Sequence, residues 1–162
     1  MTVCGFDPGT ICTGFGILDI GQNTVKHIAH GTIRPKSESL SERLKEIHLK
    51  VSDILDEFKP AEASIETSFF AVNAQTALKL GQVRGVIILA ASLKHIPVFE
   101  YSPTEIKKAT CGYGHAEKAQ ISDMVAMLLG MKKTSITSKD ASDALAVGIC
   151  HSASRRLRRL AG

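Results

Sequence analysis

The chain has 162 residues, of which 44% are hydrophobic and 22% are charged, and its formal net charge is +4. This length fits one domain spanning residues 1–162, large enough to bury a core without disulfides or structural metal ions. The composition excludes an extensively disordered chain. No apolar run of about 18 residues and no signal peptide is evident, so we expect a cytoplasmic protein without a membrane segment. The four cysteines lack metal-site spacing and are expected to be reduced thiols.

Three β-strands are predicted at the start of the chain. Residues 3–6 are apolar and end at the turn formed by Asp7, Pro8 and Gly9. Residues 13–19 and 24–33 follow after short connections, which favours an antiparallel meander. Gly14 and Gly16 indicate that another element approaches the second strand closely.

Helices and strands alternate in the remainder of the chain. The predicted order is residues 39–58 (helix), 63–66 (strand), 73–93 (helix), 97–101 (strand), a short helix from 103 and a helix over 116–129. The pattern predicts an α/β fold: a mixed five-stranded sheet, with the meander extended by parallel strands and flanked by helices. Ala77, Gly81 and Gly85 form a flat stripe that packs either on the sheet or on a second copy of the chain.

The last helix is predicted to begin with two acids. Asp140 and Asp143 are three residues apart, so they project about 60° apart around a helix axis. Ser138 is a good N-cap, and acids in the first turn suit the positive end of the helix dipole. Capping and metal binding therefore carry comparable weight from this stretch alone.

Two further acids, Asp7 and Glu66, end predicted strands. If these elements are neighbours, four carboxylates would repel one another unless divalent cations neutralised them, and magnesium or manganese suits such an all-oxygen site. Two such ions support phosphodiester hydrolysis. Lys107 and Lys118 flank a glycine loop and are either phosphate contacts or ordinary surface lysines. Phe69 is either a core residue or a platform for an unpaired base.

The arginines of the last residues allow two interpretations. Arg155, Arg156, Arg158 and Arg159 crowd a short basic tail over about 152–162. The tail is either a solvated helix end or a phosphate contact.

The chain resembles the RuvC family of Holliday junction resolvases, in the RNase H-like superfamily. The matching stretches are G-F-D-P-G-T with T-G-F-G, I-E-T-S-F, N-A-Q-T-A-L-K-L-G-Q-V-R-G, V-F-E-Y and D-A-S-D-A-L-A. The resemblance implies an RNase H-like fold and a homodimer that nicks two opposed strands of a four-way DNA junction with magnesium, during recombination and repair. It implies Asp7, Glu66, Asp140 and Asp143 as catalytic and metal-binding acids.

The resemblance also assigns contacts outside the four acids. Lys107 and Lys118 match the phosphate-facing lysines of the family, and Phe69 matches its base-stacking aromatic residue. A branch-migration motor complex of RuvA and RuvB is the implied partner. The chain departs from the family pattern at Thr67, at Phe70 and in the arginine-rich tail.

Three alternatives remain open at this level. The Asp7 turn also suits an actin-like nucleotide phosphotransferase, although the chain has no room for the second lobe. A non-catalytic DNA-architecture protein would not need four acids beside phosphate. An RNase H-like nuclease acting on RNA is the nearest rival. The preferred cleavage sequence and the general base stay open, with His115 and His151 given equally plausible surface positions.

Overall fold

The computed structural model describes residues 1–67, 73–136 and 138–161, apart from the side chains of Lys118 and Ala161. The elements of the described ranges are β1 (Thr2–Asp7), β2 (Thr13–Ile20), β3 (Val25–Ile33), α1 (Leu40–Phe58), β4 (Glu62–Glu66), α2 (Ala74–Leu93), β5 (Val98–Tyr101), α3 (Pro103–Cys111), α4 (Lys118–Leu128), a 3-10 turn (Lys133–Ser135) and α5 (Lys139–Ala161). Phe69 lies outside the described residues, as does the side chain of Lys118.

The strands form one sheet in the order β3-β2-β1-β4-β5. β1, β2 and β3 pair antiparallel, whereas β4 pairs parallel with β1 on one side and with β5 on the other. The short connections allow the hairpins, whereas α1 leads from β3 to β4 and α2 from β4 to β5, so that each helix returns the chain to the opposite end of the sheet. The predicted mixed sheet, a meander extended by parallel strands, is therefore confirmed.

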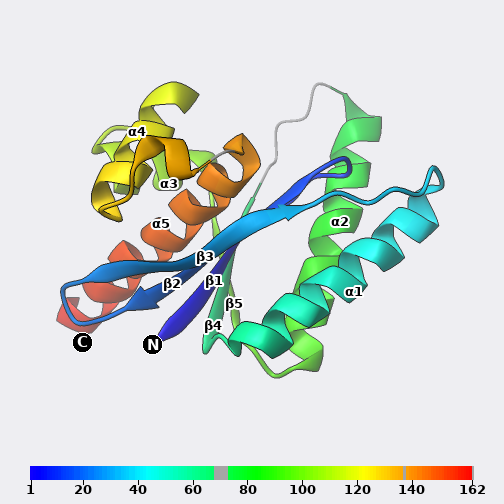
Figure 1. Cartoon of the computed structure of the whole chain (residues 1–162), viewed down its shortest axis with the longest axis horizontal. Coiled ribbons are helices and arrows are strands. Elements are labelled where there is room, and N and C mark those ends of the chain that lie inside the picture. The colour runs from blue at the N-terminus through cyan, green and yellow to red at the C-terminus, as the bar shows by residue number, and fades with distance from the viewer. Residues whose placement is uncertain (68–72, 137, 162) are drawn as a thin grey trace.

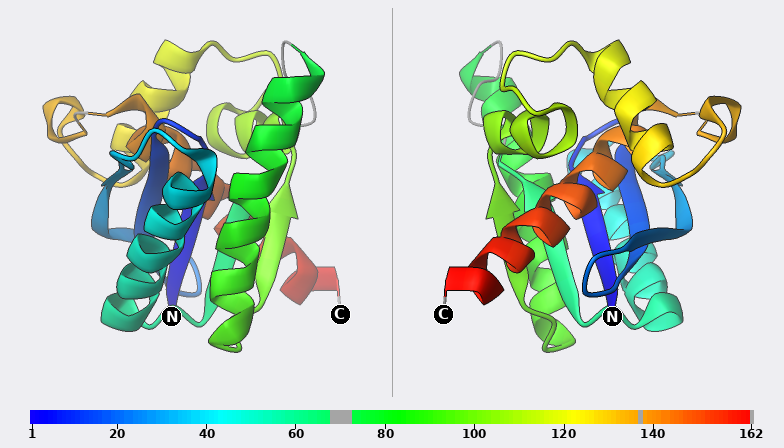
Figure 2. Two further views of the ribbon diagram at one scale, coloured as in Figure 1. Left: turned by 90° about the vertical axis from the view of Figure 1, so that its right-hand side faces the viewer. Right: turned by 90° about the vertical axis from the view of Figure 1, so that its left-hand side faces the viewer.

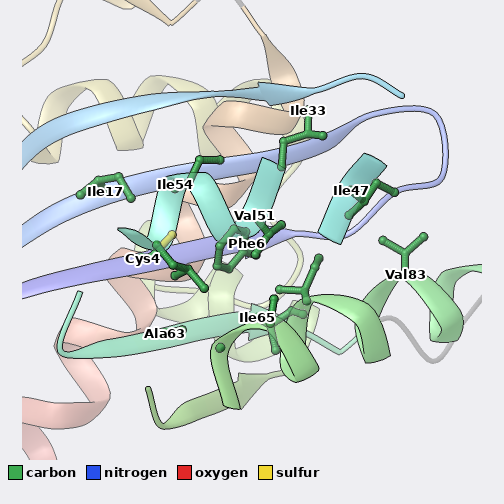
Figure 3. Packing of buried hydrophobic residues seen from close by; sticks show 14 residues of the cluster. Cys4, Phe6, Ile17, Ile33, Ile47, Val51, Ile54, Ala63, Ile65 and Val83 are labelled. Carbon is green, nitrogen blue, oxygen red and sulfur yellow. The ribbon is translucent and has the colours of Figure 1, made fainter. Parts of the chain in front are cut away.

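Helices cover both faces of the sheet (Figure 1). α1 and α2 pack on one face, and α5 crosses the other face with α3 and α4 beside it, as the two side views in Figure 2 show. Figure 3 shows Phe6 and Ile65 of the sheet meeting Val51 of α1 in the first of these layers. All three side chains are essentially fully buried, so this layer anchors β1 and β4 side by side.

Glycines bring α5 unusually close to the other face of the sheet. A Cβ atom at Gly14 would lie 1.9 Å from the carbonyl oxygen of Asp140, and one at Gly5 would lie 2.3 Å from that of Ala144. A Cβ at Gly16 would lie 2.7 Å from a methyl carbon of Leu145. The prediction that another element approaches Gly14 and Gly16 closely is confirmed, and that element is α5.

The small-residue stripe of α2 faces outward. A Cβ at Gly81 or Gly85 would meet no atom within 4 Å, so these glycines do not pack on the sheet. Of the helices in the described ranges, α2 alone is long and apolar enough to cross a membrane, with 22% of the window buried. This helix is nevertheless not a continuous apolar run, because Lys79, Gln82 and Arg84 lie within it. Arg84 pairs with Glu100 of β5, which ties α2 to the sheet.

The last helix extends well beyond the acidic stretch from which it was predicted. The arginine-rich residues after His151 continue α5 as regular helix, which agrees with the interpretation of the basic tail as a helix end. Ser138 precedes the helix as expected, but its buried hydroxyl has no hydrogen-bond partner among the described residues, so the capping role expected of Ser138 is wrong.

Candidate active site

Asp7 and Glu66 end two neighbouring strands at the same edge of the sheet. β1 and β4 run parallel, with Phe6 opposite Ile65, so the next residue of each strand is an acid. Carboxyl ends of adjacent parallel strands meet at one edge, which brings these two side chains together. The pairing of β1 with β4 thus brings together two acids that are far apart in the sequence.

Both acids lie on the face of the sheet that α5 covers. Side chains alternate between the two faces of a strand. Phe6 and Ile65 belong to the core beneath α1 and α2, so Asp7 and Glu66 lie on the opposite face. Gly5, two residues before Asp7, already touches the backbone of α5, which confirms the assignment of faces.

Asp140 is placed by the close contact at Gly14. Gly14 is the register partner of Asp7 across the β1–β2 pair, and it abuts the carbonyl of Asp140. The first turn of α5 therefore lies directly above the strand end that carries Asp7. Any larger residue at Gly14 would lift this turn from the sheet.

The position of Asp143 follows from a contact made by His151, near the middle of α5. The Nε2 atom of His151 lies 2.7 Å from a carboxylate oxygen of Glu62, which joins α5 to the start of β4. From Glu62 to Glu66 the strand advances about 13 Å, and from His151 back to Asp143 the helix spans about 12 Å. Both paths run toward the edge at which β4 ends, so Asp143 lies on the part of α5 nearer that edge.

The four acids are half-buried and come from three elements. Among the described residues no three histidine, cysteine or acidic side chains close on a single point. The described residues therefore contain no preformed metal cage, and the elements that carry the four acids meet at one edge of the sheet, the acid patch. A donor set made only of carboxylate oxygens fits hard divalent cations better than zinc or copper.

Cys12, which the sequence did not single out, lies beside this patch in the connection between β1 and β2. Burial, a hydrogen bond to Asp140 and the charge of that carboxylate together raise the pKa of its thiol to about 11. The thiol is therefore protonated at neutral pH and can donate to Asp140. The position of Cys12 between Asp7 and β2 is the feature of the sequence that could have indicated this contact.

Arg43 and Glu46 of α1 fix the loops next to the patch. The Nε atom of Arg43 donates to the carbonyl of Thr10 at 3.0 Å, and its Nη1 donates to that of Ser37, also at 3.0 Å. Glu46 accepts hydrogen bonds from the backbone N–H groups of Lys36 and Ser37. These contacts join the turn after Asp7 to the segment after β3. No local sequence pattern predicts them.

The other predicted residues have different outcomes. Lys107 is half-buried in α3, which starts where β5 ends, at the same edge as the acids. Lys118 begins α4, but its side chain is not described, and neither is Phe69. His115 is exposed. The surface position expected of His151 is wrong, because its ring is fully buried between Glu62 and the hydroxyl of Tyr101.

Comparison with known proteins assigns the chain to a family. Residues 3–151 match the family model described as crossover junction endodeoxyribonuclease RuvC. A protein of that name from Oleidesulfovibrio alaskensis is 46% identical over 161 residues, covering 99% of this chain and 96% of its own. Another from Pseudothermotoga lettingae is 41% identical, covering 98% of each.

Solved structures agree with this assignment. RuvC of Thermus thermophilus in complex with a Holliday junction substrate has a TM-score of 0.90 at 31% identity, covering 98% of this chain and 96% of its own. The fold and these matches define a nuclease of the RNase H-like class. The chain belongs to the RuvC family of crossover junction endodeoxyribonucleases.

Proposed function

We propose that Asp7, Glu66, Asp140 and Asp143 hold two divalent cations, with magnesium as the natural occupant and manganese as a substitute. The observation that carries the proposal is the convergence of the ends of β1 and β4 with the first turn of α5. Four carboxylates on one patch gain from shared cations, because their mutual repulsion is then neutralised.

The residues of the chain have distinct tasks in this site. Asp7 and Glu66 stand on strands locked by the core, which fixes their separation. Asp140 and Asp143 belong to α5, which packs directly on glycine residues of the sheet. This close packing fixes the distance of the helix from the sheet. When bound, two cations supply an activated water and stabilise the leaving oxygen of an in-line phosphoryl displacement. Lys107 and Lys118 are proposed to orient neighbouring phosphates, and Phe69 to stack on an unpaired base.

The substrate we propose is a four-way DNA junction, cut by hydrolysis in two opposed strands during homologous recombination and repair. The family name specifies crossover junctions, and the Thermus thermophilus relative was solved with a Holliday junction substrate. The actin-like and purely architectural alternatives find no support in this family assignment. An RNA substrate is tested below.

The working form we propose is a homodimer joined through α2. The outward side of this helix carries Leu78, Leu89 and Leu93, which are 65%, 53% and 64% exposed, beside the open glycines Gly81 and Gly85. An exposed apolar stripe on a helix favours a partner for that face, and glycines permit close helix approach. Two copies joined here present two acid patches to one junction. We further propose a branch-migration motor of RuvA and RuvB as the functional partner, and the cytoplasm as the compartment.

The test compares Asp7→Asn and Asp143→Asn with the wild-type protein on a synthetic four-way junction, a linear duplex and a structured RNA. In both variants the cleavage rate should fall by about a hundredfold or more, because each acid supplies part of the proposed metal site. Both variants should still bind the junction. Asp53→Asn, on the exposed side of α1, is the matched control and should cut normally. Normal cutting by both site variants contradicts the metal assignment, and preferential cutting of the RNA contradicts the substrate assignment.

A further inference from the structure

A hollow with an apolar lining and a basic rim lies at the end of the molecule opposite the acid patch. It has a volume of about 1030 Å³ and is bounded by the turn between β2 and β3 and by the last turns of α5. Residues of the β2–β3 turn and of the C-terminal end of α5 both line it. The apolar lining includes Met1, Ile20, Val25, Ile149, Leu157 and Leu160.

The arginines around this hollow are remote from the chemistry. Arg159 follows Asp143 by sixteen positions in one continuous helix, which corresponds to about 24 Å along the axis. Figure 2 shows the last turns of α5 extending away from the body of the protein. The basic end of α5 therefore does not serve the scissile phosphate of its own subunit.

Two of the four arginines are used to hold the helix in place. Arg155 lies 3.3 Å from a carboxylate oxygen of Glu62, and the guanidinium of Arg158 stacks 4.8 Å from the ring centre of Phe99. For Arg156 and Arg159, both exposed and both lining the hollow, the described part of the chain provides no ion pair. These two guanidinium groups are free to receive carboxylates.

Apolar side chains accompany these free charges. Leu157 and Leu160 are 67% and 76% exposed, one helical turn apart. Exposed leucines and unpaired arginines on the rim of a hollow are complementary to an amphipathic segment. Such a segment carries acids along one side and apolar residues along the other.

We propose that this hollow is the docking site of an acidic amphipathic segment from a partner protein. Its leucine-like side chains fill the space between the β2–β3 turn and α5, and its carboxylates pair with Arg156 and Arg159. Duplex DNA fits less well, because interfaces with DNA are dominated by polar contacts to phosphate rather than by an apolar floor. An anionic membrane fits less well because the surface is concave.

The experiment selects binders from a phage-displayed library of short random peptides against the intact protein. We expect enrichment of peptides that combine glutamate or aspartate with leucine, isoleucine or phenylalanine at helical spacing. The double variant Arg156→Glu with Arg159→Glu should bind a labelled selected peptide about tenfold more weakly or worse, because two charge pairs become repulsive. Leu157→Ser with Leu160→Ser should weaken binding too.

The matched control is Lys45→Glu with Lys50→Glu on the exposed side of α1, which changes the net charge equally and should leave peptide binding unchanged. Peptide binding should also leave junction cleavage intact. The proposal is overturned if no acidic amphipathic peptide is enriched, or if the reversed arginines leave its affinity unchanged. It is equally overturned if the reversal weakens binding of junction DNA or of phosphatidylserine vesicles instead.

Discussion

Replacing Gly14 by alanine should separate the two halves of the acid patch. The added Cβ would lie 1.9 Å from the carbonyl oxygen of Asp140, whereas Cβ atoms essentially never approach other atoms within 3.0 Å. The first turn of α5 must therefore retreat by about 1.1 Å, the difference between those two distances. Asp7 and Glu66 stay on the sheet, so only Asp140 and Asp143 move.

A displacement of about 1 Å in a catalytic arrangement costs on the order of a hundredfold in rate. Overpacking of this kind also costs about 1–3 kcal/mol of stability. We expect Gly14→Ala to remain folded, since the contact involves only the first turn of a long helix, and to cut about a hundredfold more slowly. Single-turnover cleavage of a synthetic junction at saturating protein measures the rate, and urea unfolding measures the stability.

Gly148→Ala is the matched control on the same helix. Its Cβ would lie 2.7 Å from a terminal methyl carbon of Leu18, a side-chain end that can move aside. Alanine also gains about 0.5–1 kcal/mol over glycine inside a helix. Gly148→Ala should therefore cut at nearly the wild-type rate. If a folded Gly14→Ala also cuts at the wild-type rate, or if both variants lose activity equally, close seating of α5 does not position the acids.

Two further predictions concern the buried histidine and the outer side of α2. Burial lowers the pKa of His151 in the folded protein, despite the opposing effect of Glu62. The neutral ring therefore contributes stability above the unfolded pKa of about 6.5. This stability is lost as the pH falls through and below that value. His151→Gln should be less stable at pH of about 7 but should show a flatter pH dependence in urea unfolding; a slope as steep as that of the wild type contradicts the assignment. Leu89→Asp should shift a dimer to monomer in sedimentation, whereas Leu49→Asp, equally 53% exposed on α1, should not.

Local patterns in the sequence determined the elements and the identity of the acids. Periodicity and turn residues predicted the strand meander and the helices, because these depend on neighbours along the chain. Asp7 and Glu66 stood out as charges at the ends of apolar segments, and Gly14 and Gly16 as gaps left for another backbone. These signals are local, and the structure agrees with their placement at strand ends and beneath α5.

Long-range packing decided what local patterns left open. Strand register joined Asp7 to Glu66, and the contact of α5 with Gly14 brought Asp140 above them. The same packing buried His151, which the sequence had placed at the surface. A polar residue is buried when distant partners satisfy it, and no spacing along the chain encodes Glu62 and Tyr101 as its partners. The sequence thus supplied the chemical groups, and the packing of α5 on the sheet determined where they meet.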